Sequence, residues 1–392
     1  MTSLRSGLWS GLMVAGLLAG VDLAAAADPE LRITGEVEVV YDWSADRCRN
    51  EAIPDLAARA FRDAEDRVQL IVSHTEAIRM IGPNLDAVEV ACDPVSRSAH
   101  NADPSLFSDA EWIAAPYTED GMTVYALVHN EHHGHDHDGQ CPSGDYFKCW
   151  YNSVTLAVSV DGGASYRHAA DPPGHLVASF PAVYEPDGGT YGMFTPSNII
   201  RGPDGYYYAF VKAQAYLTRQ QFTCLMRTAA LADPGSWRYW DGESFAGVFV
   251  DPYRDDFRFR REHTCRAIAS NDIGQMTDSV TYNSDLDRYV LVGVSADSPD
   301  GEEVWGFYYA FSDDLIHWTR RRLLKEVPLP WTVTRPQFVS YLYPALLDPE
   351  SPSRNFEATG RTAYLYYTRN NLGHTSLDRD LVRVPVAFFD GK

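Results

Sequence analysis

Positive charge is scarce in this sequence. Lysine and arginine together number 33 against 54 aspartates and glutamates, which gives the 392 residues a formal net charge of −21. An acidic surface repels phosphate groups, so neither nucleic acid nor an anionic membrane is an expected partner. The sequence also contains no Gly-x-Ser-x-Gly elbow, no phosphate-binding glycine loop and no dinucleotide fingerprint. These absences argue against an esterase, a kinase and a dehydrogenase.

Long hydrophobic runs are also missing, with one exception near the N-terminus. Residues 8–21 are largely apolar, follow Arg5 and lead into the alanines at 24–27. A basic start, a short apolar core and small residues at its end are typical of a secretory signal peptide, and the run is too short for a stable membrane span. We therefore expect residues 1–27 to be a signal peptide cleaved near Ala26 and Ala27, and residues 28–392 to be one secreted or periplasmic domain without a membrane span.

Helical periodicity is nearly absent. Only residues 57–66 suit a short helix, and residues 59–63 suit a strand equally well. Runs rich in aromatic and β-branched residues, separated by Gly, Pro, Asn and Asp, indicate an all-β protein. Five times a strand and a turn precede a second apolar strand that is often rich in tyrosine, at residues 68–72, 123–128, 206–211, 289–293 and 363–367. A repeated hairpin of this kind indicates a β-propeller.

The repeats predict a five-bladed β-propeller of four-stranded antiparallel blades. The innermost strands are expected to begin near five residues, Asp55, Trp112, Asn198, Asp278 and Tyr343. Residues 33–41 alternate in polarity and are expected to supply the outermost strand of the last blade, which would close the ring.

Six cysteines in an exported protein predict disulfide bonds. Cys141 and Cys149 bracket a short loop that a disulfide can close, while the other four cysteines lie in or beside neighbouring repeats. One arrangement is Cys141 with Cys149, Cys224 with Cys265 and Cys48 with Cys92, but spacing alone leaves other pairings open.

Two turns resemble those of known propellers. Residues 159–166, Ser-Val-Asp-Gly-Gly-Ala-Ser-Tyr, resemble the Asp-box of sialidases, with serine and tyrosine in place of the usual threonine and tryptophan. Residues 312–318, Ser-Asp-Asp-Leu-Ile-His-Trp, resemble the Ser-x-Asp-Leu-x-x-Trp turn of five-bladed glycosidases of glycoside hydrolase families 43, 32 and 62. Residues 195–200 and 343–347 resemble inner-strand openings of that superfamily. The catalytic phrases Trp-Ala-Pro-Asp and Glu-Gly-Pro are missing, so the resemblance supports the fold more than the activity.

The resemblance implies a secreted glycoside hydrolase that acts on a polysaccharide or oligosaccharide, with an arabinofuranoside as the implied substrate class. Hydrolysis of a glycosidic bond needs two carboxyl groups across the scissile bond. In a propeller, the starts of innermost strands and the ends of second strands surround one mouth, which offers three candidates. We expect Glu131 to be the general acid and Asp55 the general base. Asp278 is expected to be a third carboxylate that orients the acid. The family has its base in an Asp-Pro setting, whereas Asp55 follows a proline.

The same geometric rule, together with two arginines chosen for carboxylate or acidic-sugar binding, gives a set of expected substrate-binding residues: Arg59, His74, His129, Asn198, Lys212, Arg266, Tyr343 and Arg369. Each carboxylate also has a purely structural interpretation. Asp55 can cap the turn before its strand, Glu131 can be solvated at the start of a polar loop, and Asp278 can bind neighbouring backbone amides.

A histidine-rich segment at residues 131–138 offers imidazole and carboxylate ligands for zinc, nickel or copper. Glycines at 134 and 139 suggest a loop without a fixed scaffold, so no specific metal site is expected and no cofactor is required, although a divalent cation can bind. Two other functions stay open: a carbohydrate-binding propeller without catalysis, and a polysaccharide lyase that uses His74, His129 and a metal ion. We expect a monomer.

Overall fold

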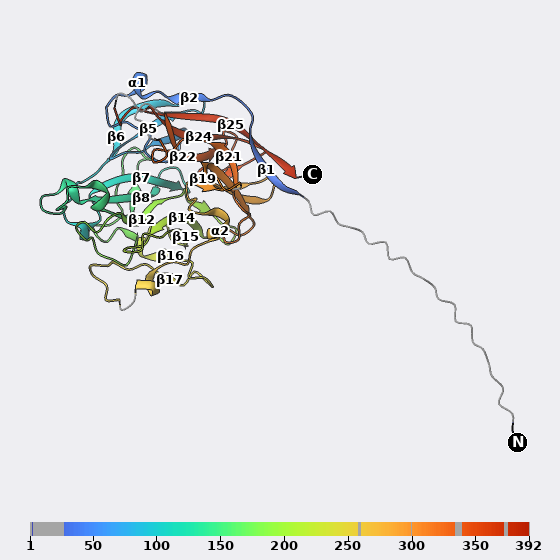
Figure 1. Ribbon diagram of the computed structural model, residues 1–392. Helices are drawn as coiled ribbons and strands as arrows, with labels where there is room; N and C mark the ends of the chain where they lie inside the picture. The colour runs from blue at the N-terminus through green and yellow to red at the C-terminus, as the bar shows by residue number, and fades with distance from the viewer. Residues whose placement is uncertain are drawn as a thin grey trace.

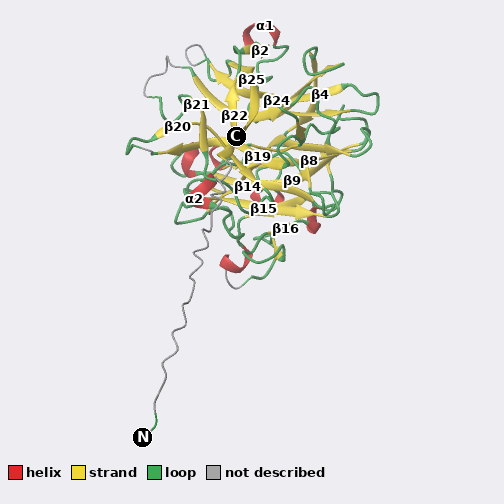
Figure 2. Ribbon diagram, turned by 90° about the vertical axis from the view of Figure 1, so that its right-hand side faces the viewer, coloured by secondary structure: helices red, strands yellow, loops and turns green. Residues whose placement is uncertain are grey.

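The computed structural model describes residues 2, 27–257, 260–298, 300–333, 339–371 and 375–391. The predicted signal peptide lies outside the described residues, apart from Thr2 and Ala27. Strands dominate the molecule, and the only helices among the described residues are very short (Figures 1 and 2). They are α1 (Trp43–Asp46), α2 (Ser270–Ile273) and five 3₁₀ turns at Pro104–Leu106, Gly134–Asp136, Tyr146–Lys148, Pro234–Ser236 and Arg260–His263. The all-β prediction is confirmed.

The strands form four hydrogen-bonded sheets, of which the first is a simple antiparallel meander. It contains β3 (Arg59–Arg62), β4 (Val68–Val72), β5 (Glu76–Gly82) and β6 (Glu89–Arg97), in that order. Residues 59–62 therefore form a strand and not a helix, which is one of the two structures that the sequence allowed.

The second sheet has eleven strands and contains one parallel contact. Its main path runs through β7 (Ala110–Thr118), β8 (Val124–His133), β9 (Trp150–Ser159), β12 (Tyr191–Pro196), β14 (Tyr207–Gln214), β15 (Gln221–Thr228), β16 (Arg238–Tyr239) and β17 (Gly247–Val248). Beside this path lie β10 (Arg167–His168), β11 (Leu176–Ser179) and β13 (Ile200–Arg201). β12 and β9 run parallel and join two antiparallel sets, since all other pairs in the sheet are antiparallel.

The last two sheets have five strands each. One contains β18 (Ser279–Asn283), β19 (Arg288–Asp297), β20 (Val304–Ser312), β21 (Arg322–Glu326) and β23 (Ala358–Thr359). The other contains β22 (Ser340–Leu347), β24 (Thr362–Asn370), β25 (Arg379–Gly391), β1 (Ala27–Ile33) and β2 (Glu38–Tyr41). Both N-terminal strands pair with β25, so the start of the chain completes the final sheet, which confirms the expectation for residues 33–41.

All five predicted second strands are present, as β4, β8, β14, β19 and β24. The predicted start of the third inner strand is wrong. β12 begins at Tyr191 and ends at Pro196, and Asn198 lies in the break between β12 and β13. Pro196 has no N–H to continue the ladder, and the Asn198 side chain instead bonds the backbone of Val280 in the next sheet, at 2.8 and 2.9 Å.

Aromatic side chains fill the spaces between neighbouring sheets. Trp318, at the end of the Ser-x-Asp-Leu-x-x-Trp turn, is buried and packs edge-on against Phe210 of the second sheet, with ring centroids 5.8 Å apart. Tyr166, at the end of the Asp-box-like turn, packs in a cluster that contains Phe61 of the first sheet. The two turns therefore place aromatic rings between sheets.

The structure contains three disulfides, Cys48–Cys92, Cys141–Cys149 and Cys224–Cys265. The pairing named from the sequence is confirmed. Among the described residues, no helix has the length and apolar character needed to cross a membrane.

Candidate functional site

Asp55 occupies one side of a cluster of polar residues formed by the first and last sheets. Its backbone N–H donates to the carbonyl of Ser73 at 3.0 Å, which holds the residue beside the end of β4. Its carboxylate forms an ion pair with Arg379, accepts a hydrogen bond from the Tyr343 hydroxyl at 3.3 Å and lies 3.9 Å from Nε2 of His74. The carboxylate is thus fixed in position by three groups that do not belong to its own strand.

Glu131 lies on another side of this cluster, near the end of β8. Alternate residues of a strand share a face, so His129, Glu131 and His133 point the same way. One oxygen of Glu131 is 2.7 Å from Nε2 of His133, and the other is 3.5 Å from Nδ1 of His129. Burial opposes a charge on His133, but the hydrogen bond and the charge of Glu131 outweigh it and raise the pKa of His133. The predicted polar loop therefore begins later than expected, because β8 continues through His133.

Asp278 forms the third corner, just before β18. Its Oδ2 accepts the backbone N–H of Val294 at 3.0 Å, and the nearest cations are Lys212 and Arg59. Burial raises the pKa of Asp278 despite these partners, and burial likewise lowers the pKa of Lys212. The charges of Asp278 and Glu131 both act on Lys212.

Arg59 is less available than the sequence suggested. The side chain is buried, and its guanidinium donates to the carbonyls of Ala114 at 3.1 Å, Ala58 at 3.2 Å and Asp278. Burial lowers its pKa to about 10. Arg59 therefore joins three sheets through backbone carbonyls and contributes positive charge beneath Asp278.

Aromatic rings connect the two histidine-bearing walls of the cluster. Trp112 packs against His74, His129 and His133 at centroid distances of 5.9, 6.0 and 6.3 Å. Phe194 packs against His129 with ring centroids 6.2 Å apart, and Nζ of Lys212 lies 5.0 Å from the centre of the Phe194 ring. Such rings provide flat apolar faces beside charged groups, which is the composition that sugar rings need for stacking and hydroxyl recognition.

The loop between Cys141 and Cys149 completes this wall. Tyr146 lies edge-on to His133 at 5.1 Å and beside Trp150 at 5.0 Å. Because Tyr146 lies between Cys141 and Cys149, the disulfide holds it in place. Burial raises the pKa of Tyr146 well above its ordinary value, so its hydroxyl stays protonated.

Of the sequence-predicted residues, the structure brings together Asp55, Glu131, Asp278, His74, His129, Lys212, Tyr343 and Arg59. It does not bring in the other three. Asn198 is committed to the backbone of Val280. Arg369 pairs with buried Asp380 at 2.7 Å, because it points to the other face of β24. Arg266 lines a separate surface depression of about 350 Å³ together with Trp240 and His317.

Arg379 is the most important residue that the sequence did not single out, and Trp150 and Tyr146 are others. The rule applied to the sequence used the starts of innermost strands and the ends of second strands. A third strand runs antiparallel to the second, so it begins at the same end of the sheet. Arg379 begins β25 and Trp150 begins β9, and extending the rule to third strands finds both. Tyr146 carries no such signal, since a loop positions it.

This arrangement can bind a neutral or weakly charged polar ligand and move protons at two places. A fixed carboxylate, Asp55, lies on one side, and Asp278, a carboxyl group with a raised pKa, lies on the other. The charge of Glu131 acts on both Tyr343, which bonds Asp55, and Lys212, on which Asp278 also acts. Groups whose environments differ in this way are suited to act as base and acid in one site.

No protein-family model matches the chain, and no curated protein matches it. Its structure is similar to that of a protein of unknown function from Dyadobacter fermentans, with a TM-score of 0.52 and 11% identity over 92% of this chain and 99% of that one. A family 117 glycoside hydrolase from Zobellia galactanivorans matches with a TM-score of 0.48 and 10% identity over 93% of this chain and 91% of that one. An endo-arabinase from Bacteroides thetaiotaomicron matches with a TM-score of 0.47 and 11% identity over 91% and 99%. Glycoside hydrolases are thus among the solved structures to which this chain is similar.

Proposed function

We propose that this protein is a secreted glycoside hydrolase that cleaves a polysaccharide or oligosaccharide by acid–base catalysis with carboxyl groups at the mouth of a propeller. The observation that carries the proposal is the grouping of Asp55, Glu131 and Asp278 in one cluster lined by aromatic rings. Hydrolysis of a glycosidic bond needs such opposed carboxyl groups. Removal of residues 1–27 during export, and a monomeric mature protein, belong to the same proposal.

The proposed architecture has five blades. The eleven-stranded sheet divides at its parallel contact between β9 and β12 into two antiparallel sets. With the three remaining sheets, this division gives five units, each containing four or more strands. The inner strands are then β3, β7, β12, β18 and β22, and the proposed mouth lies at the end where β7 begins and β8 ends.

Asp55 is the proposed general base. Arg379 forms an ion pair with its carboxylate, and Tyr343 and His74 orient it. A carboxylate held in this way can accept a proton from an attacking water, provided that the water lies within hydrogen-bond reach. The alternative of a structural cap does not account for a carboxylate whose partners come from the far end of the chain.

Asp278 is the proposed general acid, which differs from the role expected from the sequence. A general acid must hold its proton until the leaving oxygen takes it, and burial favours the protonated form of Asp278. Glu131 has both oxygens near imidazole nitrogens of His129 and His133, so we assign it to orienting these rings and the substrate. Lys212 lies near both carboxyl groups and can bind a sugar hydroxyl.

The test is the release of reducing ends from a panel of polysaccharides, which includes arabinans because the sequence resemblance implies an arabinofuranoside. Wild type is compared with Asp55→Asn, Asp278→Asn and Glu131→Gln, and Glu119→Gln on the exposed surface serves as the control. We expect the first two changes to abolish release, Glu131→Gln to weaken it, and the control to retain it. Full activity in Asp55→Asn or in Asp278→Asn would contradict the assigned roles.

A carbohydrate-binding protein without catalysis is the second candidate, and the aromatic wall of Trp112, Phe194 and Tyr146 favours it equally. Binding of an oligosaccharide without release by wild type would select it. The lyase alternative requires His129 as a base, but Nε2 of His129 is 2.9 Å from Asn152 and Nδ1 is 3.0 Å from Thr195. Because both ring nitrogens already have partners, His129 is better suited to positioning neighbouring groups than to acting as a base.

A further inference from the structure

We propose that Asp109, His132 and His137 bind a zinc ion on the face of β8 opposite the candidate site. The proposal does not depend on the proposed function. The three side chains come from the residue before β7, from the end of β8 and from the loop that follows it. Their ligand atoms all lie within 4.8 Å of one another. Two imidazoles and one carboxylate are a donor set that zinc accepts in proteins.

The distances already approach those of a tetrahedral site. Oδ2 of Asp109 is 3.3 Å from Nδ1 of His132 and 2.9 Å from Nε2 of His137. Two ligands bonded to one zinc ion at about 2.1 Å are about 3.4 Å apart in a tetrahedron, which is close to both of these distances. Nδ1 of His100 lies 3.8 Å from the other oxygen of Asp109, and either this nitrogen or a water can be the fourth ligand.

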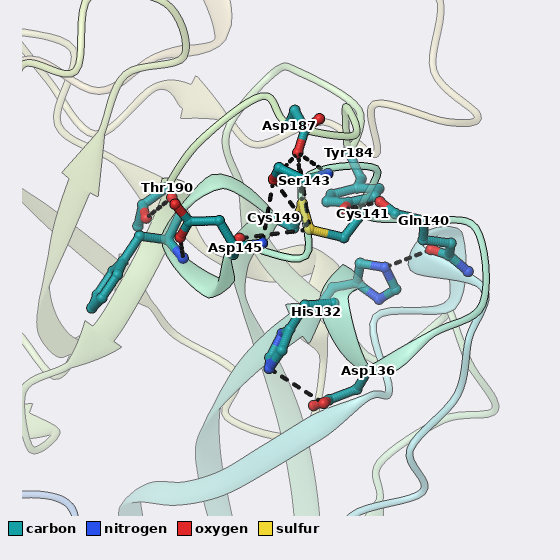
Figure 3. The surroundings of a disulfide bond; sticks show 12 residues. His132, Asp136, Gln140, Cys141, Ser143, Asp145, Cys149, Tyr184, Asp187 and Thr190 are labelled. Carbon is teal, nitrogen blue, oxygen red and sulfur yellow. Dashed lines mark hydrogen bonds and ion pairs between the residues drawn. A yellow bond between two sulfur atoms is a disulfide. The ribbon is translucent and has the colours of Figure 1, made fainter.

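The hydrogen bonds of Gln140 determine which nitrogen of His132 is free. The Gln140 amide nitrogen donates to the carbonyl of Ala102 at 2.6 Å, so its oxygen is the acceptor that faces His132. Nε2 of His132, 2.8 Å from that oxygen, must therefore carry a proton (Figure 3). In the neutral ring this leaves a lone pair on Nδ1.

That lone pair is aimed at another acceptor. Nδ1 of His132 is buried and has no hydrogen-bond partner among the residues that the structure describes, although it lies 3.3 Å from Oδ2 of Asp109. The same oxygen already accepts the backbone N–H of His133 at 2.9 Å and Nε2 of His137 at 2.9 Å. A lone pair facing a carboxylate in the protein interior is unfavourable unless a cation lies between them. A metal ion provides that cation, and His137, whose Nε2 is 2.9 Å from the same oxygen, adds a second imidazole ligand.

The loop around these residues is more ordered than its sequence suggests. Gly134 donates its N–H to the carbonyl of Cys149 at 2.9 Å, and a Cβ at this position would clash with the Tyr184 hydroxyl. The Tyr184 hydroxyl donates to the carbonyl of Gln140 at 2.6 Å, next to the Cys141–Cys149 disulfide (Figure 3). The expectation that glycines leave this segment without a scaffold is wrong, and Gln140 belongs to that scaffold.

The experiment is a calorimetric titration of the chelator-stripped protein with zinc chloride, repeated with cobalt chloride and followed by visible absorption. Asp109→Asn and His137→Gln remove ligands, and Gln140→Leu removes the partner that orients His132. His135→Gln is the matched control, because His135 lies in the same segment but outside the cluster. Near-ultraviolet circular dichroism shows whether each variant is folded.

We expect one zinc ion per chain in wild type and in the control, and a tetrahedral cobalt spectrum in both. Gln140→Leu should weaken zinc binding by about 10–100-fold, and the two ligand variants by more. Equal affinity in the control and in the ligand variants would show adventitious binding by surface histidines and overturn the proposal. Absence of saturable binding in wild type would also overturn it. Should one ligand variant fail to fold, Gln140→Leu still distinguishes these outcomes.

Discussion

The two faces of β8 carry the same kinds of side chain but use them differently. On the face toward the candidate site, each imidazole of His129 and His133 has a polar partner, and the Glu131 carboxylate lies between them. On the opposite face, Nδ1 of His132 is buried without a hydrogen-bond partner among the described residues and points toward Asp109. Residue type therefore does not distinguish a proton-handling site from a metal site, whereas the partners of each ring nitrogen do.

The difference follows from where each face lies in the fold. The first face borders groups from several sheets, and the charge of Glu131 acts on Tyr343 and on Lys212. The second face is contacted by His137 and Gln140, which lie just before the loop that the Cys141–Cys149 disulfide closes, so its donors converge. The strand period of two separates the functions of adjacent residues, and a one-residue shift in register would exchange them.

The largest expected effect tests whether the two faces are independent. Asp55→Asn should lower kcat for polysaccharide hydrolysis by about 10²–10⁴-fold, because general base catalysis is lost. Zinc affinity should not change in this variant. His137→Gln should show the reverse pattern, with zinc affinity lost and kcat kept within about tenfold. Steady-state kinetics and calorimetry on the same preparations check both, and parallel losses in the two variants would mean that the faces act as one site.

Arg379→Met should have the next largest effect. It removes the cation paired with Asp55 while keeping an apolar stem of similar length. The loss of fixed geometry should lower kcat/KM by about 10²-fold, since small displacements of a reacting group have effects of this size. Arg369→Met is the matched control, because that arginine pairs with Asp380 instead. Equal losses in both variants would indicate general destabilisation of the last sheet, which thermal unfolding would detect.

Loss of the Cys141–Cys149 disulfide should affect both faces moderately. The bond closes a short loop with a sequence separation of 8, and removing such a closure costs about 2–3 kcal/mol in the chain-entropy model. We expect the Cys141→Ser, Cys149→Ser double variant to unfold at lower denaturant concentration and to bind zinc more weakly, because Gln140 and His137 lose their support. Removal of Cys224–Cys265 should lower stability without changing zinc affinity. A double variant with unchanged zinc affinity would show that the segment is held by its other contacts.

The sequence predicted the strands better than the details of the candidate site. Repeated hairpins predicted the strands, and the strand ends led to Asp55, Glu131 and Asp278 as candidates, because the chain direction of each strand fixes where its polar end lies. The rule failed for Asn198, where a proline interrupts the inner strand. It also omitted Arg379, because only the first two strands of each repeat were considered.

The grouping of side chains on the second face of β8 could not be predicted from the sequence, for a physical reason. The histidine-rich segment looked unstructured because its glycines were interpreted as flexible, while Gly134 is needed for close packing under Tyr184. The position of Asp109, more than twenty residues earlier in the chain, depends on the pairing of β7 with β8. Three-dimensional contacts, and not local spacing, bring the three proposed ligands together.

The smallest expected effect concerns the pH dependence of stability. Burial raises the pKa of Asp278 in the folded protein, with Lys212 and Arg59 as the facing cations. A carboxyl group with a raised folded pKa binds its proton more tightly when folded, so its stabilising contribution is present at low pH and is lost as the pH rises through the folded pKa. Asp278→Asn cannot ionise and should therefore match wild type in acid and unfold about 1–2 °C higher at neutral pH. Thermal unfolding of both proteins across this range, with exposed Asp313→Asn as the control, measures the difference. A lower midpoint for Asp278→Asn at neutral pH would mean that pairing with Lys212 outweighs burial, and that Asp278 is a fixed carboxylate like Asp55 and not the acid that we propose.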